Sequence, residues 1–413
     1  MKNIKKILAA ILALIFILSI TACKKTDETI VPEESAVVET EPDIPEETIV
    51  HSEPITTEPT IILLSNDTIL VDGVEISKNT ADVYLTTNEY NIVNITVPGH
   101  YEISGEAANT QICVDLGDEA QNNENAKVHV YLNNLTVENN NAPVILFKNV
   151  YEAPCESVTL TEDMMTAGAN LYIMSDTVNN IITTYTENEF NSSIYSNMTM
   201  GISGYLGSNG ILNITSNSTG LTTNKNMFVF GGTLLVRSES DGIVAANSES
   251  ILTINDGYVE VISVTDGNGI VSNGTMVINN GSVYAQASSL GENTGLKAPD
   301  GVNILGGSVQ ATGNKPVDIS SENTYVAFEF DEICSAGTYT LSDENGAVLY
   351  NCITENDFHH MLLVGDYIKT GNCILLGDFG QNFVVYETEA PSEISNFIFT
   401  ISEGANRFLA MYA

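Results

Sequence analysis

The sequence predicts an all-β protein whose main body is a right-handed parallel β-helix. A glycine recurs between about residues 190 and 315 at intervals of 22, 25, 24 and 26 residues, as Gly210, Gly232, Gly257, Gly281 and Gly307. The residues two and four positions after each glycine are apolar, which is the period-2 pattern of short strands with one buried face. A second anchor, glycine followed by leucine or isoleucine, recurs at Gly220, Gly242, Gly269 and Gly295. Two turns and about three short strands in each repeat are typical of one coil of a solenoid.

The same alternation assigns side chains to the inside of the predicted coils. Stacking of the repeats places Leu234, Val259, Val283 and Val309 above one another, and each buried aliphatic side chain contributes about 1.5–3 kcal/mol. We expect these side chains, together with Val261 and Ile254, to face inward. No window has the 3.6-residue spacing of a helix, so a helical solenoid is excluded. The crossover rule for parallel strands makes the predicted coil right-handed.

Residues 1–22 are expected to be a lipoprotein signal peptide rather than part of the fold. Three lysines precede an apolar run over residues 7–20, and Cys23 follows at once. The segment Ile20-Thr21-Ala22-Cys23 resembles the bacterial lipobox, whose cysteine is acylated and becomes the N-terminus after cleavage. The alternative is a single membrane span, but the run is shorter than the ~20 residues that a span needs. We therefore expect lipidation at Cys23, export, and a location on the extracellular face of the cell membrane.

Residues 23–60 are expected to form a disordered acidic stalk. They are rich in proline, glutamate and threonine, and such a segment cannot bury enough apolar surface to offset its ordering entropy. A stalk after a lipidated cysteine would hold the folded part away from the bilayer. The folded part is divided into residues 61–320, the predicted β-helix, and residues 321–413, a C-terminal β unit.

The segments on either side of the regular repeat also have strand-like patterns. Between about residues 92 and 190 the spacing is looser, as expected of the first coils and a cap. After about Tyr325, alternating runs are separated by turns that contain Gly or the sequence Asp-Glu-Asn-Gly. We expect these runs to form a small antiparallel β cap that protects the edge of the last coil.

The charge of the chain excludes nucleic acid as a partner. Only 14 Lys and Arg residues stand against 53 Asp and Glu, for a formal net charge of −39, whereas phosphate binding needs basic patches. An acidic polysaccharide would also be repelled unless a divalent cation lay between the two surfaces. The cysteines beyond Cys23 have no metal-ligand spacing and are interpreted as small buried hydrophobic residues. Their disulfide state is left open: Cys113, Cys155, Cys334, Cys352 and Cys373.

Four local segments carry a resemblance to a known family. An opening segment, residues 98–105, is followed by a second strand and turn at residues 130–137. The Asp241-Gly242-Ile243 turn with residues 252–257 has the form of a rung, and residues 336–341 have that of a closing β unit. These segments resemble a family of secreted bacterial carbohydrate-binding domains with a calcium-binding, polysaccharide-lyase-like parallel β-helix, and the resemblance covers about residues 60–390. It implies carbohydrate binding and a calcium cofactor.

The residues at the corresponding turns depart from the family pattern. The family carries acidic pairs shortly after each Gly-Ile anchor, which suit a cation with six to eight oxygen ligands. Here these places read Asn224-Lys225-Asn226, Asn247-Ser248-Glu249, residues 273–275 and residues 299–301. The remaining candidate Ca²⁺ ligands are Asp241, Asp266 and Asp300, completed by Asn268 or backbone carbonyls. An aspartate before Gly or Asn also stabilises a turn, and this alternative stays open.

The residue inventory disfavours catalysis. A lyase that acts on uronic acids needs a base opposite a bound cation, and only Lys225, Arg237 and Lys297 are basic on the regular rungs. Arg237 lies at a position of its strand that faces outward, but no basic residue stands at the same position of the neighbouring rungs. We therefore interpret it as an ion-pair or solubility residue. Neither Gly-His-Gly nor Arg-x-Lys occurs, and His100 and His129 lie before the regular repeat. The protein is therefore predicted not to be an enzyme.

The outward positions of the rungs suggest a saccharide-binding surface. Tyr258 and Tyr284 would lie side by side with polar neighbours, and an aromatic face packs on the apolar face of a sugar ring. The predicted ligand-binding residues are Tyr258, Tyr284, Glu260 and Gln310. The predicted function is a cell-surface lipoprotein that binds plant or bacterial cell-wall polysaccharide without cutting it. The alternatives are a calcium-dependent polysaccharide lyase-like enzyme and a structural adhesin or spacer.

Overall fold

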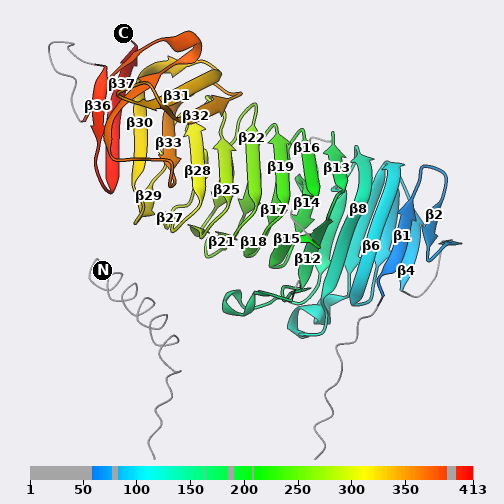
Figure 1. The fold of residues 1–413 in the computed structure, drawn as a ribbon. Helices are drawn as coiled ribbons and strands as arrows, with labels where there is room; N and C mark the ends of the chain where they lie inside the picture. The colour runs from blue at the N-terminus through cyan, green and yellow to red at the C-terminus, as the bar shows by residue number, and fades with distance from the viewer. Residues whose placement is uncertain are drawn as a thin grey trace, which may run out of the picture. The chain divides into compact units, whose positions relative to one another are not determined.

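A computed structural model of the chain describes residues 58–412, except 77–81, 163, 185–189, 207–208 and 388–396. The described part is all-β, with three short 3₁₀ helices at Asp118–Asn122, Cys155–Ser157 and Asp378–Gly380 (Figure 1). The predicted all-β class is thus confirmed. All described residues belong to one compact unit. The predicted signal peptide, the lipidation site Cys23 and most of the predicted stalk lie outside the described residues.

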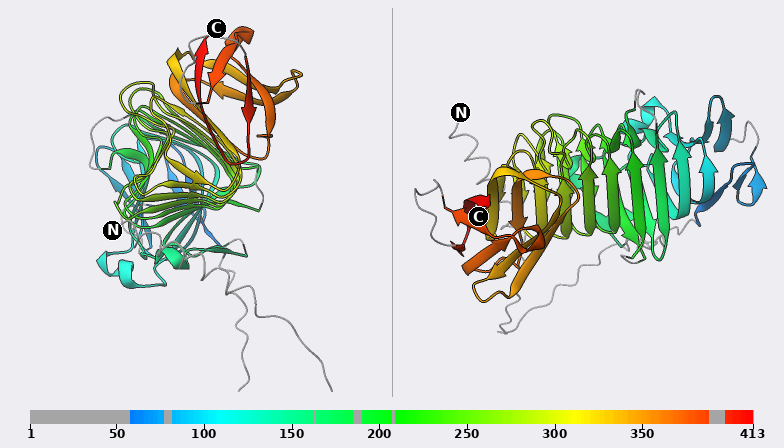
Figure 2. Two further views of the ribbon diagram at one scale, coloured as in Figure 1. Left: turned by 90° about the vertical axis from the view of Figure 1, so that its left-hand side faces the viewer. Right: turned by 90° about the horizontal axis from the view of Figure 1, so that it is seen from above.

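Parallel strands of the described chain stack in three columns, and each repeat passes through the columns in turn (Figures 1 and 2). The first column contains β6 (Gly99–Ala108), β8 (Val128–Asn139), β12 (Ala169–Met174), β15 (Met200–Tyr205), β18 (Met227–Val229), β21 (Ile251–Ile254), β24 (Thr275–Ile278), β27 (Val302–Ile304) and β29 (Ile319–Ser321). The second begins on the long strand β8 and contains β13 (Val178–Thr183), β16 (Ile211–Ser216), β19 (Thr233–Ser238), β22 (Tyr258–Ser263), β25 (Ser282–Gln286) and β28 (Ser308–Gly313).

The third column runs through the remaining strand of each repeat. It contains β5 (Asn91–Ile95), β7 (Thr110–Asp115), β9 (Ile145–Asn149), β14 (Ser192–Ser196), β17 (Thr219–Thr223), β20 (Ile243–Ala245), β23 (Ile270–Ser272) and β26 (Leu296–Lys297). Its outer edge is closed by β4 (Val83–Thr87), which is antiparallel to β5. The Leu or Ile of each second anchor lies in this column in register with the next, as Leu221, Ile243, Ile270 and Leu296.

The predicted register of the second column is confirmed. Leu234 is the Cα partner of Val259, Val259 that of Val283, and Val283 that of Val309. These side chains, with Val261 and Ile254, are at most 1% exposed and belong to one continuous apolar core. Because the side-chain period of a strand is two, a shift of one residue would have exposed all of them.

The two sets of recurring glycines have different physical causes. Gly232, Gly257, Gly281 and Gly307 have φ between 82° and 105°, the left-handed region that disfavours a Cβ atom. At Gly242, in the second set, φ is not positive, but an added Cβ would lie 2.0 Å from Val261 Cγ1. Gly210 differs from the rest of the first set, since its φ is not positive and close approach of Met174 O excludes a side chain there.

The ends of the stack are built from irregular and antiparallel strands. At the first end, β1 (Thr60–Leu64) pairs in parallel with β6, and β2 (Ile69–Val71) and β3 (Val74–Glu75) fold back on it. A hairpin of β10 (Leu160–Thr161) and β11 (Met164–Met165) interrupts the early repeats.

The C-terminal strands add a second core beside the last coil (Figure 2). β33 (Phe358–Val364) pairs antiparallel with both β28 and β30 (Tyr325–Cys334). A separate antiparallel sheet contains β31 (Gly337–Asp343), β32 (Val348–Thr354), β34 (Gly371–Leu376) and β36 (Ile398–Ile401). β35 (Phe383–Tyr386) is antiparallel to β37 (Ala405–Tyr412), whereas β30 and β37 are parallel. The antiparallel expectation therefore holds for these strands except for this one pair.

The five described cysteines are all free thiols. Four are buried in strands, as expected of small apolar residues, whereas Cys155 departs from this prediction and is half-buried in the 3₁₀ helix Cys155–Ser157. Within the described ranges, no helix is long and apolar enough to cross a membrane.

Candidate functional site

The predicted ligand-binding residues share the outer face of the second column. Glu260 is the Cα partner of Tyr284, and Tyr284 is the Cα partner of Gln310. The ring centroids of Tyr258 and Tyr284 are 5.2 Å apart. Tyr258 is 37% exposed and donates a hydrogen bond of 2.6 Å to Glu260 Oε2. Burial and the neighbouring Glu260 carboxylate raise the pKa of Tyr258, so its hydroxyl stays protonated.

The C-terminal strands extend this aromatic surface with two further tyrosines. Tyr350 of β32 and Tyr367, which follows β33, are stacked with centroids 4.1 Å apart. Burial raises the pKa of Tyr350, and the Tyr284 hydroxyl is near enough to contribute. The sequence did not predict either tyrosine as part of this surface, because the local alternation around residues 347–350 does not show which coil the strand covers.

Gln310 requires a correction. Its outward parity was predicted correctly, but its side chain is only 2% exposed. The Gln310 amide donates to Ile353 O at 3.0 Å and accepts from the Tyr350 hydroxyl at 3.1 Å. A ligand cannot reach it in this arrangement, because β32 covers it. Gln310 therefore positions Tyr350 instead of contacting a saccharide.

A shallow groove of about 340 Å³ lies on the same face, next to the tyrosines. Its floor includes the row Asn180, Asn213, Leu235 and Glu260, whose Cα atoms are successive register partners. Asn213 donates to Asn180 Oδ1 at 2.9 Å, so the amides are held in a ladder. Amide and carboxylate groups beside the apolar Leu235 match a sugar ring, which has hydroxyls at its edge and an apolar face.

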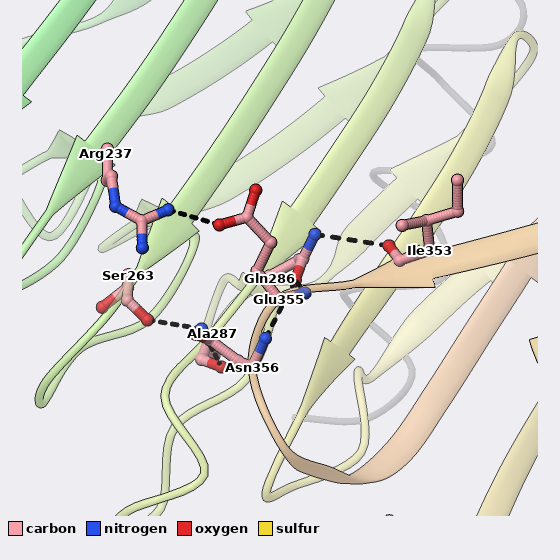
Figure 3. A network of polar contacts seen from close by, with 7 residues as sticks. All are labelled: Arg237, Ser263, Gln286, Ala287, Ile353, Glu355 and Asn356. Carbon is pink, nitrogen blue, oxygen red and sulfur yellow. Dashed lines mark hydrogen bonds and ion pairs between the residues drawn. The ribbon is translucent and has the colours of Figure 1, made fainter. Parts of the chain in front are cut away.

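The turn between β32 and β33 contacts the second column through Arg237, which lines this groove, and through neighbouring residues (Figure 3). Arg237 lines the groove and forms an ion pair of 2.6 Å with Glu355 of the turn. The Gln286 side chain accepts from Glu355 N at 2.7 Å and donates to Ile353 O at 3.4 Å. Asn356 donates to two backbone carbonyl oxygens of the second-column segments, Ser263 O at 2.6 Å and Ala287 O at 3.0 Å. The guanidinium of Arg237 is thus engaged as an ion-pair partner.

His100 and His129 lie on the outer face of the first column. They are register partners on β6 and β8, and their rings stack at 4.6 Å. His100 Nδ1 lies 2.9 Å from the Tyr131 hydroxyl, and His129 Nδ1 lies 3.2 Å from the Tyr172 hydroxyl. Burial lowers the pKa of His129 to about 3, with smaller effects from His100 and Lys127. The β10–β11 hairpin covers this cluster, since Met165 N donates to the Tyr172 hydroxyl at 2.7 Å.

The three candidate calcium ligands are not brought together. Asp241 Oδ1 accepts from both the backbone N and the side-chain Nδ2 of Asn268, at 2.7 and 2.9 Å. Asp266 Oδ1 accepts from Asn293 Nδ2 at 2.9 Å. Asp300 lies at another corner, between β26 and β27, where its N donates to Gly274 O.

Asp241 and Asp266 therefore act in turn-stabilising side-chain ladders between coils. In the part of the chain that the structure describes, no group of three or more His, Cys, Asp or Glu side chains is placed to hold one metal ion. Asp241 Oδ1 is poorly suited to bind a cation, because the two N–H groups of Asn268 already point at it.

Comparison with known proteins gives one family model that matches part of the chain. The model of a family described as carbohydrate-binding domain-containing protein matches residues 89–268, which include Tyr258 and Glu260 but not Tyr284. No curated protein matches the chain. Among solved structures, the chain is similar to a polysaccharide lyase-like protein from C. thermocellum, determined as a gadolinium derivative. The identity is 18% and the TM-score 0.41, over 64% of this chain and 95% of that chain.

Proposed function

We propose that this protein is a cell-surface lipoprotein that binds a plant or bacterial cell-wall polysaccharide without cleaving it. The observation that carries the proposal is the Tyr258–Tyr284 pair beside the groove floored by Asn213 and Glu260. Such a surface offers ring faces for stacking and polar groups for hydroxyls. The family model matched over residues 89–268 supports carbohydrate as the ligand class.

We further propose that the three columns are the faces of a right-handed parallel β-helix. Each repeat between β12 and β26 contributes one strand to every column, and successive repeats pair in parallel and in register. Parallel crossovers between such strands are right-handed in nearly all known cases.

Two contacts support binding over catalysis at this groove. Arg237 is paired with Glu355, and Glu260 accepts the Tyr258 hydroxyl. A proton-transfer reaction needs an acid or base that is free to reach the substrate, whereas these groups are already held by neighbours. They are suited to fixing a ligand's position.

Attachment to the outer side of the membrane completes the proposal. Lipidation of Cys23 would anchor the chain, and the predicted stalk that precedes β1 would let the groove reach an insoluble polymer. A single lipid chain gives only weak membrane binding, so stable anchoring would depend on the multiple acyl chains of a bacterial lipoprotein.

Depletion of the purified mature protein by insoluble polysaccharides tests the proposal. We expect wild-type protein to be removed from solution, and the double variant Tyr258→Ala/Tyr284→Ala to bind about tenfold more weakly, the equivalent of ~1.4 kcal/mol. Tyr84→Ala, which removes a half-buried tyrosine on β4, is the matched control and should bind normally.

Three outcomes would contradict the proposal. Equal binding by the double variant and the wild type, with both folded by circular dichroism, would remove the tyrosine surface as the site. Release of unsaturated uronic ends from a soluble polymer would identify a lyase instead. Failure to bind any polysaccharide in the panel would favour a structural adhesin or spacer.

A further inference from the structure

A second groove lies on the turns that follow the third-column strands, away from the tyrosine surface. It has a volume of about 480 Å³. Its lining comes from the end of β9, from the turns after β14, β17 and β20, and from the 3₁₀ helix at Asp118–Asn122. The polar lining residues are Gln121, Asn149, Asn197, Asn224, Lys225 and Asn247.

The turns that form this groove are stacked by backbone hydrogen bonds. Asn224 N donates to Ser196 O and Ala246 N donates to Thr223 O, both at 2.8 Å. The amide side chains therefore recur at the spacing of the coils, about 4.8 Å.

Neighbouring side chains hold the amides of the groove in place. Asn224 donates to Asn197 Oδ1 at 3.2 Å and accepts from the Tyr195 hydroxyl at 2.9 Å. The next position in the stack is Ala246, which has no group to continue the ladder. The amides beside it are thus preorganised and open to a ligand on that side.

The charge of this groove is opposite to that of the whole protein. None of its lining residues is a carboxylate, although the chain has 53 Asp and Glu residues. Lys225 is exposed, and among the described residues its ammonium group forms no ion pair. The tyrosine-side groove differs, since it contains Glu260 and its Arg237 is paired.

A smaller hollow of about 220 Å³ adjoins the groove and shares Lys225 and Asn247 with it. Two carboxylates, Glu152 and Glu249, lie there. Glu152 is occupied, because it accepts from Thr199 N at 2.8 Å and Thr199 Oγ1 at 2.7 Å. The carboxylate that contacts the amide groove itself is Asp115, which accepts from Asn149 at 2.8 Å and is paired with Lys148 at 2.8 Å. Lys225 is therefore the unpaired charge among the lining residues of the groove.

We propose that the amide groove binds a saccharide that carries a carboxylate, with Lys225 as the partner of the carboxylate and the amides as partners of the hydroxyls. No divalent cation is needed, because the ammonium supplies the positive charge. These turns are where the family resemblance calls for acidic pairs, and Asn224-Lys225-Asn226 stands there instead. The inference rests on the proposed function and deepens it by naming acidic saccharides as a ligand class.

Titration calorimetry with two matched oligosaccharides tests the assignment. The probes are a β-1,4-linked glucuronic acid oligomer and the β-1,4-linked glucose oligomer of the same length. They differ only at C6 of each sugar, which is a carboxylate in the first and a hydroxymethyl group in the second. Each titration is run once with and once without a chelator. We expect the wild type to bind the uronate, Lys225→Gln to bind it at least about tenfold more weakly, and Lys225→Arg to retain most of the affinity.

Lys297→Gln is the matched control, because Lys297 is an exposed rung lysine on β26 with the same charge. Equal losses in Lys225→Gln and Lys297→Gln would mean a general charge effect and would overturn the site. Uronate binding that disappears in chelator would also overturn the site, because it would depend on a divalent cation. If the wild type binds neutral but not acidic oligomers, only this inference fails. If it binds neither, this inference fails, and depletion by the panel of insoluble polysaccharides decides the proposed function separately.

Discussion

Arg237 Nη1 lies 2.6 Å from Glu355 Oε2, which joins β19 to the turn between β32 and β33 across 118 residues of sequence. This exposed ion pair belongs to a larger contact that includes the buried Gln286 and the half-buried Asn356 (Figure 3). Because Tyr350 belongs to the strand that leads into this turn, the contact also places Tyr350 beside Tyr284. The C-terminal strands thereby become part of the candidate saccharide surface.

Gln286→Ala should destabilise the protein more than loss of the ion pair. Gln286 is 4% exposed and satisfies backbone groups of the turn, so its removal should cost about 1–3 kcal/mol. The Arg237 and Glu355 side chains are 50% and 52% exposed, and a double-mutant cycle on them should give about 0.2–1 kcal/mol, reduced by salt. Denaturant unfolding measures both. A cycle energy that exceeds the Gln286 effect would contradict this interpretation of the interface.

Gly257→Ala should destabilise the stack, whereas Gly231→Ala should not. Gly257 has φ of 105°, and an added Cβ would lie 2.7 Å from Gly232 O. The left-handed conformation alone costs about 1–2 kcal/mol for an L-residue. At Gly231 an added Cβ meets nothing within 4 Å. Thermal unfolding of the two variants gives the comparison, and equal melting temperatures would argue against the left-handed turn.

His129 should make stability depend on pH between about 6.5 and 3. Its folded-state pKa is lowered to about 3 by burial, below the unfolded value of about 6.5. The unfolded chain therefore binds more protons in this window, and stability falls as the pH falls, by up to ~1.4 kcal/mol per pH unit.

His129→Gln removes this contribution, so its stability should decline less steeply on acidification than that of the wild type. Urea unfolding at a series of pH values measures the difference in unfolding free energy between the two proteins. The contributions of the carboxylates, which both proteins share, cancel in this difference. Parallel curves for the two proteins would show that His129 titrates alike in the folded and unfolded states.

Calcium should leave the melting temperature unchanged. Asp241 Oδ1 already accepts two N–H groups of Asn268, and Asp266 Oδ1 accepts the Asn293 amide, so an ion would have to displace them. Scanning calorimetry in millimolar Ca²⁺ and in chelator makes the comparison. A higher melting temperature with Ca²⁺ that is lost in Asp241→Asn would restore the calcium site implied by the family resemblance.

Cys23→Ala should release the protein from the membrane fraction or leave its precursor uncleaved. The cysteine follows a segment that resembles a lipobox, and the acyl group on its thiol is the expected anchor. Fractionation and immunoblotting of cells that express each form give the readout. Cys113→Ala, a buried cysteine of β7, serves as the control. Unchanged fractionation and processing of the Cys23 variant would refute lipidation.

The sequence by itself determined the register of the repeats. Alternation about Gly257 and Gly281 specifies which side chains face inward, because strand periodicity is a local property and adjacent repeats are only one coil apart. The buried row from Leu234 to Val309 was predicted for this reason. The outward pairing of Tyr258 with Tyr284 followed from the same parity.

Only the tertiary structure decided which outward residues are accessible. Gln310 has the parity of Tyr284 but lies under β32, and Gln286 lies under the turn that follows. No local pattern encodes where a chain returns after 40 residues or more. The groove at Lys225 likewise depends on turns of several coils that are brought together by stacking, so its lack of carboxylates appears only when their side chains are placed in space.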